Sequence, residues 1–158
     1  MARNVDVPVP LRTDATDTTC DPSDFGRRVR RASAVFVKKA DAAEVALAYA
    51  RGGAQAISVL TDQKFFSGSL KDLQAVREAV SLPILRKDFL LEEYQVVESA
   101  VAGADAVLLI AKILDRPTME RLLRLAQELR LSALVEVHNE AELGESLEVG
   151  AEIVGINN

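Results

Sequence analysis

The sequence has little of several residue types, and each shortage excludes a kind of site or location. Cys20 is the only cysteine among 158 residues, so there is no internal disulfide framework, and we expect a reducing, cytoplasmic environment. Trp is absent and aromatic residues make up only 4%, which argues against a base-stacking surface. His138 is the sole histidine and has no cysteine near it, so we expect neither a metal nor a cofactor.

Charge and hydropathy exclude two classes of partner. The net charge of −5 leaves no strong basic field to attract nucleic acid. No apolar run approaches the ~18 residues of a membrane span. The first residues also lack the apolar core of a secretion signal. What remains is an ordinary globular composition, 49% hydrophobic and 27% charged, at a length that fits one domain.

The chain divides into two regions of different composition. Residues 1–24 are rich in Thr, Asp and Pro without any period, which predicts a disordered leader. Residues 25–158 are predicted to form the folded domain. Its first part is dense in Arg and Lys around one short apolar run, Ala34–Val37, where one weak strand is allowed. We interpret the arginines as a solvated face; contact with a phosphate or an acidic partner is the alternative.

From residue 41 onward, helical and strand patterns alternate strictly. Helices are predicted over residues 40–53, 69–80, 92–103, 116–129 and 139–149, and strands over residues 54–60, 82–89, 104–113, 132–138 and 151–158. The strands are continuous apolar runs, as expected where helices cover a sheet and both of its faces are buried. Strict alternation of this kind predicts an α/β fold with a parallel sheet.

A repeat favours a barrel over a doubly wound sheet. Gly-Ala introduces alternate strands at Gly53, Gly103 and Gly150, which are 50 and 47 residues apart, or two βα units. An even, uninterrupted cadence favours the barrel, although a doubly wound sheet is an alternative. Five clear strands and one weak strand fall short of the eight that close such a barrel. We therefore predict an incomplete parallel (β/α) barrel of the TIM type with five to six βα units, whose open edges favour self-association.

Local signals predict how the helices begin and which faces they bury. Ser69 is placed to cap the helix over residues 69–80, with Asp72 at the acidic position of a capping box. Asn139 is placed to cap the helix over residues 139–149. The predicted inward stripes are Val45, Ala48 and Tyr49 in the first helix and Leu70, Leu73, Val76 and Val80 in the second.

Function in a parallel barrel lies at the carboxyl ends of the strands. The residues of chemical interest near those ends are Phe65, Phe66, Lys87, Asp88, Phe89, Leu108, Leu109, Lys112, Glu136, His138, Asn157 and Asn158. They offer a cation, a carboxylate, an amide and an apolar wall, which suits acid–base chemistry on a ligand with an apolar ring.

Several of these residues also have a purely structural interpretation. Lys87 and Glu136 are also compatible with a structural ion pair. Asp88 is more simply a structural acceptor that fixes Lys87 or a loop. Core packing is the alternative for Phe65 and Phe66, although two successive residues of a strand do not point to the same side.

Four segments resemble indole-3-glycerol phosphate synthase. The segments read SVLTDQKFFSGSLKDLQAVREAVSLPILRKDF, ADAVLLIAKIL, LVEVHNEAEL and VGINN, and the resemblance as a whole covers about residues 42–158. The resemblance implies closure of an indole ring on 1-(2-carboxyphenylamino)-1-deoxyribulose 5-phosphate, a phosphosugar, with loss of carbon dioxide and water. It implies that Lys87 of LRKDF is the general acid, Glu136 of VEVH the base, and Asn157 of GINN an orienting group. It further implies that the apolar wall around the anthranilate ring comprises Phe66, Phe89 and Leu108.

The arginine-rich segment departs from that family's pattern. The resemblance places a Glu-x-Lys and an Ala-Ser-Pro-Ser on the first strand, and an ungapped alignment sets RRVRRAS there. Arg28 and Arg30 then replace the acid and the second lysine, and only Ser33 matches, as the phosphate-contacting serine. The segment is divergent, rearranged or unrelated. We therefore expect a carboxy-lyase that is impaired when alone; the alternatives are a non-catalytic, self-associating partial barrel and another phosphosugar-binding barrel.

Overall fold

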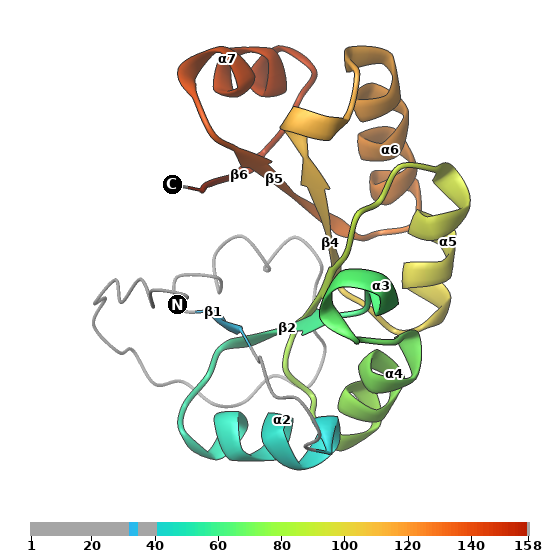
Figure 1. Ribbon diagram of the computed structural model, residues 1–158, viewed down its shortest axis with the longest axis vertical. Helices are drawn as coiled ribbons and strands as arrows, with labels where there is room; N and C mark the ends of the chain where they lie inside the picture. Colours follow the sequence, from blue (N-terminus) through green and yellow to red (C-terminus); the bar gives the residue numbers. More distant parts are fainter. Residues whose placement is uncertain (1–31, 35–40, 158) are drawn as a thin grey trace.

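The computed structural model describes residues 32–34 and 41–157, the former by their backbone alone. The predicted disordered leader, residues 1–24, lies outside the described residues, as do Arg28, Arg30 and Asn158. Within the described part, helices follow one another around the outside of a curved sheet (Figure 1).

The sheet has six parallel strands whose spatial order is the order of the chain. The strands are β1 (Ala32–Ala34), β2 (Ala56–Leu60), β3 (Ile84–Lys87), β4 (Ala106–Ile110), β5 (Ser132–Val137) and β6 (Ile153–Ile156). A doubly wound sheet reverses its strand order at a switch point, and this sheet does not. The predicted barrel-type α/β architecture is therefore confirmed, and the weak strand exists as β1.

The helices lie between successive strands, as a barrel of βα units requires. They are α2 (Ala42–Arg51), α3 (Gln63–Phe66), α4 (Leu70–Ala79), α5 (Glu93–Val101), α6 (Arg116–Glu128) and α7 (Glu140–Glu148), with a 3₁₀ turn η2 (Ala111–Ile113). The sequence patterns did not predict α3 or η2, which are single short turns in the loops after β2 and β4. The Oδ1 atom of Asp62 begins α3 by accepting the backbone N–H groups of Phe65 and Phe66 at 2.6 and 3.3 Å.

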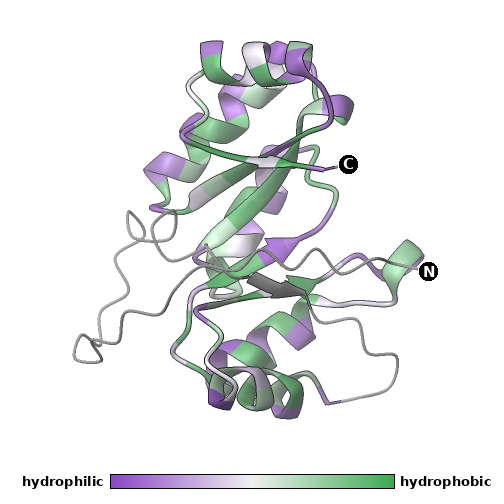
Figure 2. Ribbon diagram, turned by 90° about the vertical axis from the view of Figure 1, so that its left-hand side faces the viewer, coloured by the Kyte–Doolittle hydropathy of each residue, from purple (hydrophilic) through white to green (hydrophobic). Residues whose placement is uncertain are grey.

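Alternate residues of the strands build two apolar layers. The layer between sheet and helices is centred on side chains such as Ile57, Ile84 and Val107, all at most 1% exposed. The inner face of the sheet carries a smaller cluster made of Ala56, Leu85, Ala106 and Leu108. In Figure 2 the strands are coloured mainly as hydrophobic, whereas the helices carry both hydrophobic and hydrophilic residues. This inner face is the surface that a barrel turns toward its axis.

The predicted helix signals are largely confirmed. Ser69 Oγ accepts the backbone N–H of Asp72 at 3.2 Å, and Asn139 Oδ1 accepts that of Glu142 at 2.9 Å. The three repeated glycines end α2, α5 and α7 with φ angles of 86°, 90° and 91°, a backbone region that favours glycine.

The inward face was predicted correctly for α4 and incorrectly for α2. In α4, Leu73 and Val76 are buried, as expected. In α2, Ala46 is fully buried whereas Ala48 is exposed. The helix turns its small residues inward because Ala42, Ala46 and Ala50 share one side and pack into the cluster of Ile57 and Leu73. Large residues such as Leu47 are left outside.

Candidate active site

Lys87 and Glu136 lie on the inner face at the carboxyl ends of β3 and β5. Lys87 is two residues after Leu85 of the inner cluster, so its side chain points to the same face of the sheet. Glu136 is likewise two residues after Leu134, which packs against the inner cluster. By the strand register, Lys87 of β3 is level with Leu108 of β4, which is paired with Leu134 of β5. Glu136 therefore lies two residues further along β5 than the position level with Lys87. A (β/α)₈ barrel staggers by about one residue per strand, so alternate strands separated by two residues contribute to one layer. The two groups therefore belong to the same layer of side chains.

Glu136 is held in place by the end of β6. Asn157 donates its Nδ2 hydrogen to Glu136 Oε1 at 2.9 Å, and its backbone N–H bonds the Val137 carbonyl at 2.9 Å. The Nε2 atom of His138 lies 3.7 Å from the same carboxylate oxygen. The Glu136 side chain is 16% exposed. It is thus a fixed carboxylate that still reaches solvent.

Lys87 is half-buried and is not paired with Glu136. Within the described part of the chain, its ammonium group has no hydrogen bond or ion pair at all. The structural ion-pair interpretation therefore fails for these two residues. Lys87 is left as an available proton donor directed along the inner face.

Arg86 anchors the strand that carries Lys87, and the sequence interpretation did not single it out. Its side chain is 4% exposed and points to the helix side of β3. The guanidinium donates to Asp88, Thr61 and Glu98 at 2.9, 2.9 and 3.0 Å. It also donates to Ser99 Oγ and to the Gln95 carbonyl. A charged residue at an apolar position of a buried strand was the signal available in the sequence.

Asp88 is a structural acceptor, although not for Lys87. Its Oδ2 accepts hydrogen bonds from Thr61 Oγ1 at 2.6 Å and from Arg86, and its Oδ1 accepts the Phe89 N–H at 2.8 Å. The side chain of Gln95 then holds the following loop by donating to the Phe89 carbonyl at 3.2 Å. The backbone on both sides of Lys87 is therefore fixed by hydrogen bonds.

Three phenylalanines gather in the loops that follow β2 and β3. The Phe89 ring stacks on Phe66 with centroids 6.3 Å apart and meets Phe65 edge-on at 5.9 Å. Both phenylalanines of α3 are exposed, at 66% for Phe65 and 41% for Phe66, so neither belongs to the core. Gly68 keeps them there, because a Cβ atom at that position would stand 2.2 Å from the Leu60 carbonyl oxygen. The loop consequently folds tightly against the end of β2.

The other two predicted substrate contacts lie on the strands β4 and β1. Leu108 is 3% exposed in the inner apolar cluster, two residues before the carboxyl end of β4 at Ile110. Ser33 lies on β1, opposite Ile57 in the ladder. The roles assigned to both residues stay predictions.

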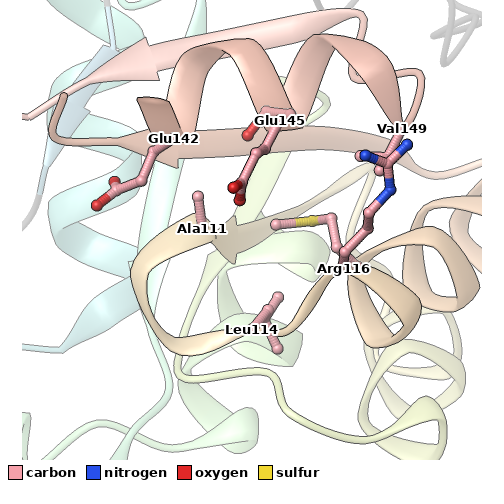
Figure 3. Close-up of a pocket in the computed structure, with 8 residues that line it drawn as sticks. Ala111, Leu114, Arg116, Glu142, Glu145 and Val149 are labelled. Carbon is pink, nitrogen blue, oxygen red and sulfur yellow. The ribbon is translucent and has the colours of Figure 1, made fainter. Parts of the chain in front are cut away.

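A separate small hollow lies on the helix side, between η2, α6 and α7 (Figure 3). It is lined by Ala111, Leu114, Arg116, Met119, Glu142, Glu145, Ser146 and Val149. Its volume of about 20 Å³ is room for roughly one water molecule, too little for a phosphosugar. Among the described residues there is no cluster of His, Cys, Asp or Glu suited to a metal ion, and no helix long and apolar enough to cross a membrane.

The order of the strands defines an incomplete barrel of the TIM type. Two titratable residues, Lys87 and Glu136, stand on its inner face at the carboxyl ends of the strands. Solved structures agree on the fold. One is 3-hexulose-6-phosphate synthase from Salmonella typhimurium, with a TM-score of 0.64 at 17% identity over 78% of this chain and 61% of that one. Another is 3-keto-L-gulonate-6-phosphate decarboxylase from Vibrio cholerae, with a TM-score of 0.61 at 15% identity over 78% of this chain and 59% of that one. The family model of indole-3-glycerol phosphate synthase matches residues 28–158, and the chain belongs to that family.

Curated relatives carry the same family name. The Nocardioides sp. indole-3-glycerol phosphate synthase is 59% identical over 74% of this chain and 45% of its own length. The proteins of Mycolicibacterium gilvum and Desulfosudis oleivorans are each 53% identical over 75% of this chain and 43% and 45% of theirs. The resemblance drawn from the sequence motifs is thus confirmed. The chain spans about half the length of the curated relatives that it matches.

Proposed function

We propose that this chain supplies the acid–base half of an indole-3-glycerol phosphate synthase active site. The reaction would close an indole ring on 1-(2-carboxyphenylamino)-1-deoxyribulose 5-phosphate with loss of carbon dioxide and water. One observation carries the proposal. Lys87 and Glu136 stand in one layer of the inner face, unpaired with each other, and Glu136 is oriented by Asn157.

The lysine and the glutamate take opposite proton-transfer roles. Lys87 protonates the ribulose carbonyl oxygen as the ring closes, because no group among the described residues engages the protons of its ammonium group. Glu136 accepts the proton lost on dehydration, and the Asn157 amide keeps its carboxylate in one orientation. Two titratable groups in different surroundings are a common arrangement for such a pair of roles.

The aromatic cluster supplies the ring slot. Phe89 follows Lys87 by two residues and stacks on Phe66, so an anthranilate ring bound there lies beside the ammonium group. Leu108 belongs to the same apolar wall, and Ser33 contacts the phosphate. The partner is accordingly a small phosphosugar molecule.

The test measures indole-3-glycerol phosphate formation by the 158-residue chain, alone and joined to the carboxyl-terminal part of the Nocardioides relative. We expect turnover of about 1 s⁻¹ or faster from the joined protein. Lys87→Met should abolish it, whereas Lys71→Met, on the exposed side of α4, should leave it unchanged. A joined protein that folds and binds substrate without turnover would contradict the proposal.

A further inference from the structure

Behind Glu136 lies a second carboxylate, Glu142, that is rigidly held at the start of α7. Its Oε1 accepts the Asn139 side-chain N–H at 2.8 Å, and its Oε2 accepts the His138 backbone N–H at 2.8 Å. Its own N–H bonds the Asn139 side chain in return. These bonds place Glu142 in the first turn of the helix, where a negative charge is favoured.

Glu142 is ionised at neutral pH. The pKa of its carboxyl group is lowered, chiefly by the backbone hydrogen bond from His138 and also by the side chains of His138 and Asn139. An ionised carboxylate only accepts hydrogen bonds. The Nδ1 atom of His138 lies 3.3 Å from Glu142 Oε2, so the hydrogen in that contact belongs to the ring.

The opposite ring nitrogen of His138 faces Glu136. With Nδ1 protonated, the neutral ring carries its lone pair on Nε2, 3.7 Å from Glu136 Oε1. In the part of the chain that the structure describes, the charged groups on this ring are Glu136 from β5 and Glu142 from α7. Asn157 and Asn139 are hydrogen-bonded to these two carboxylates. A separation of this size commonly closes to a hydrogen bond in the working complex. The ring is 30% exposed against 16% for Glu136, so it leads from the site toward solvent.

We propose that His138 receives the substrate proton from Glu136 and releases it to water, with Glu142 as the positioning residue that fixes the histidine tautomer. The idea rests on the proposed function. Glu136 takes the proton and becomes a neutral carboxyl group, which turns to bring its O–H toward Nε2. That O–H bond breaks as an N–H bond forms on the imidazole. The imidazolium then loses its Nε2 proton to water, and both side chains return to their starting state.

The tautomer is tested on the 158-residue chain itself, because its single histidine gives an unambiguous signal. A two-bond ¹H–¹⁵N spectrum at alkaline pH should show Nδ1 protonated and Nε2 free. Glu142→Ala should reduce the Nδ1-protonated population. The control, Glu145→Ala in the same helix, should not change it. An Nε2-protonated ring in the unsubstituted chain would overturn the proposal, as would an unchanged ring in the folded Glu142→Ala variant.

The relay is tested by kinetics of the chain joined to the carboxyl-terminal part of the Nocardioides relative. His138→Gln should lower kcat at least about tenfold while KM is kept, and added imidazole should restore part of the rate. A purely structural role would show no imidazole rescue. If the unsubstituted protein turns over and His138→Gln keeps its kcat, the relay is wrong and the proposed function stands. No turnover from any joined protein would overturn the proposed function and the relay with it.

Discussion

Asn157 donates a hydrogen bond of 2.9 Å to Glu136 across the β5–β6 edge. The two residues are 21 positions apart in sequence, and the parallel pairing of β5 with β6 brings them together at one rim. Asn157 is also held by its backbone bond to Val137. The amide is therefore a fixed donor, and it orients the carboxylate without neutralising its charge.

The proposed roles predict two different kinetic effects in the joined protein. Glu136→Gln keeps the shape of the side chain and removes the base, so kcat should fall by roughly 10²–10⁴. Phe89→Ala should mainly raise KM, because it removes ring burial that is worth about 3 kcal/mol at most. Steady-state kinetics separate the two parameters. A near-normal kcat in Glu136→Gln would assign this residue a structural role.

Two arginines should differ widely in their contribution to stability. Arg86→Met leaves Asp88, 11% exposed, without its main cationic partner, so the free energy of unfolding should fall by about 3–5 kcal/mol. Arg116→Met removes ion pairs on the surface, where the Arg116 side chain is 49% exposed and solvent screens the charges, so its loss of stability should be much smaller. Urea unfolding of both variants measures the difference. Equal losses would contradict the structural importance of the Arg86 network.

Stability should fall on acidification through two helix-start carboxylates. The pKa values of Asp115 and Glu142 are lowered from ordinary values of 3.8 and 4.5, first by the Thr118 hydrogen bond and by the His138 backbone bond respectively. A lowered carboxyl pKa contributes stability that is present above the ordinary value and lost as pH falls through the folded value. Urea unfolding from pH 7 to pH 3 should therefore show a decline below about pH 4.5. In Glu142→Gln the decline should be smaller, and an identical pH curve would count against this origin.

Self-association should depend on the β6 edge. Ile156 is 75% exposed on a strand that, among the described residues, pairs only with β5. Exposed apolar edge strands favour association, and a lysine on such an edge opposes it. Sedimentation should show less association for Ile156→Lys than for the unsubstituted chain. Val101→Lys, which changes an 80% exposed residue on α5, is the matched control and should associate as before.

Much of the fold could be predicted from local sequence. The alternation of helices and strands, the Ser69 and Asn139 caps and the Gly-Ala repeat depend on neighbouring residues, and these are confirmed in the structure. The rule that the carboxyl ends of parallel strands meet at one rim also predicts that Lys87 and Glu136 lie there. The short helix α3 was not predicted, because the single Asp62 cap that begins it carries no periodic signal.

By itself, therefore, the sequence determined which segments become strands and which residues stand at their carboxyl ends. The tertiary structure alone decided how these groups are paired. It left Lys87 without a partner among residues 41–157, bonded Glu136 to Asn157, surrounded Arg86 with acceptors and placed His138 between two carboxylates. It also turned Ala46 inward in α2. These outcomes depend on strand register and on the size of side chains contributed by distant segments, and no local pattern specifies either.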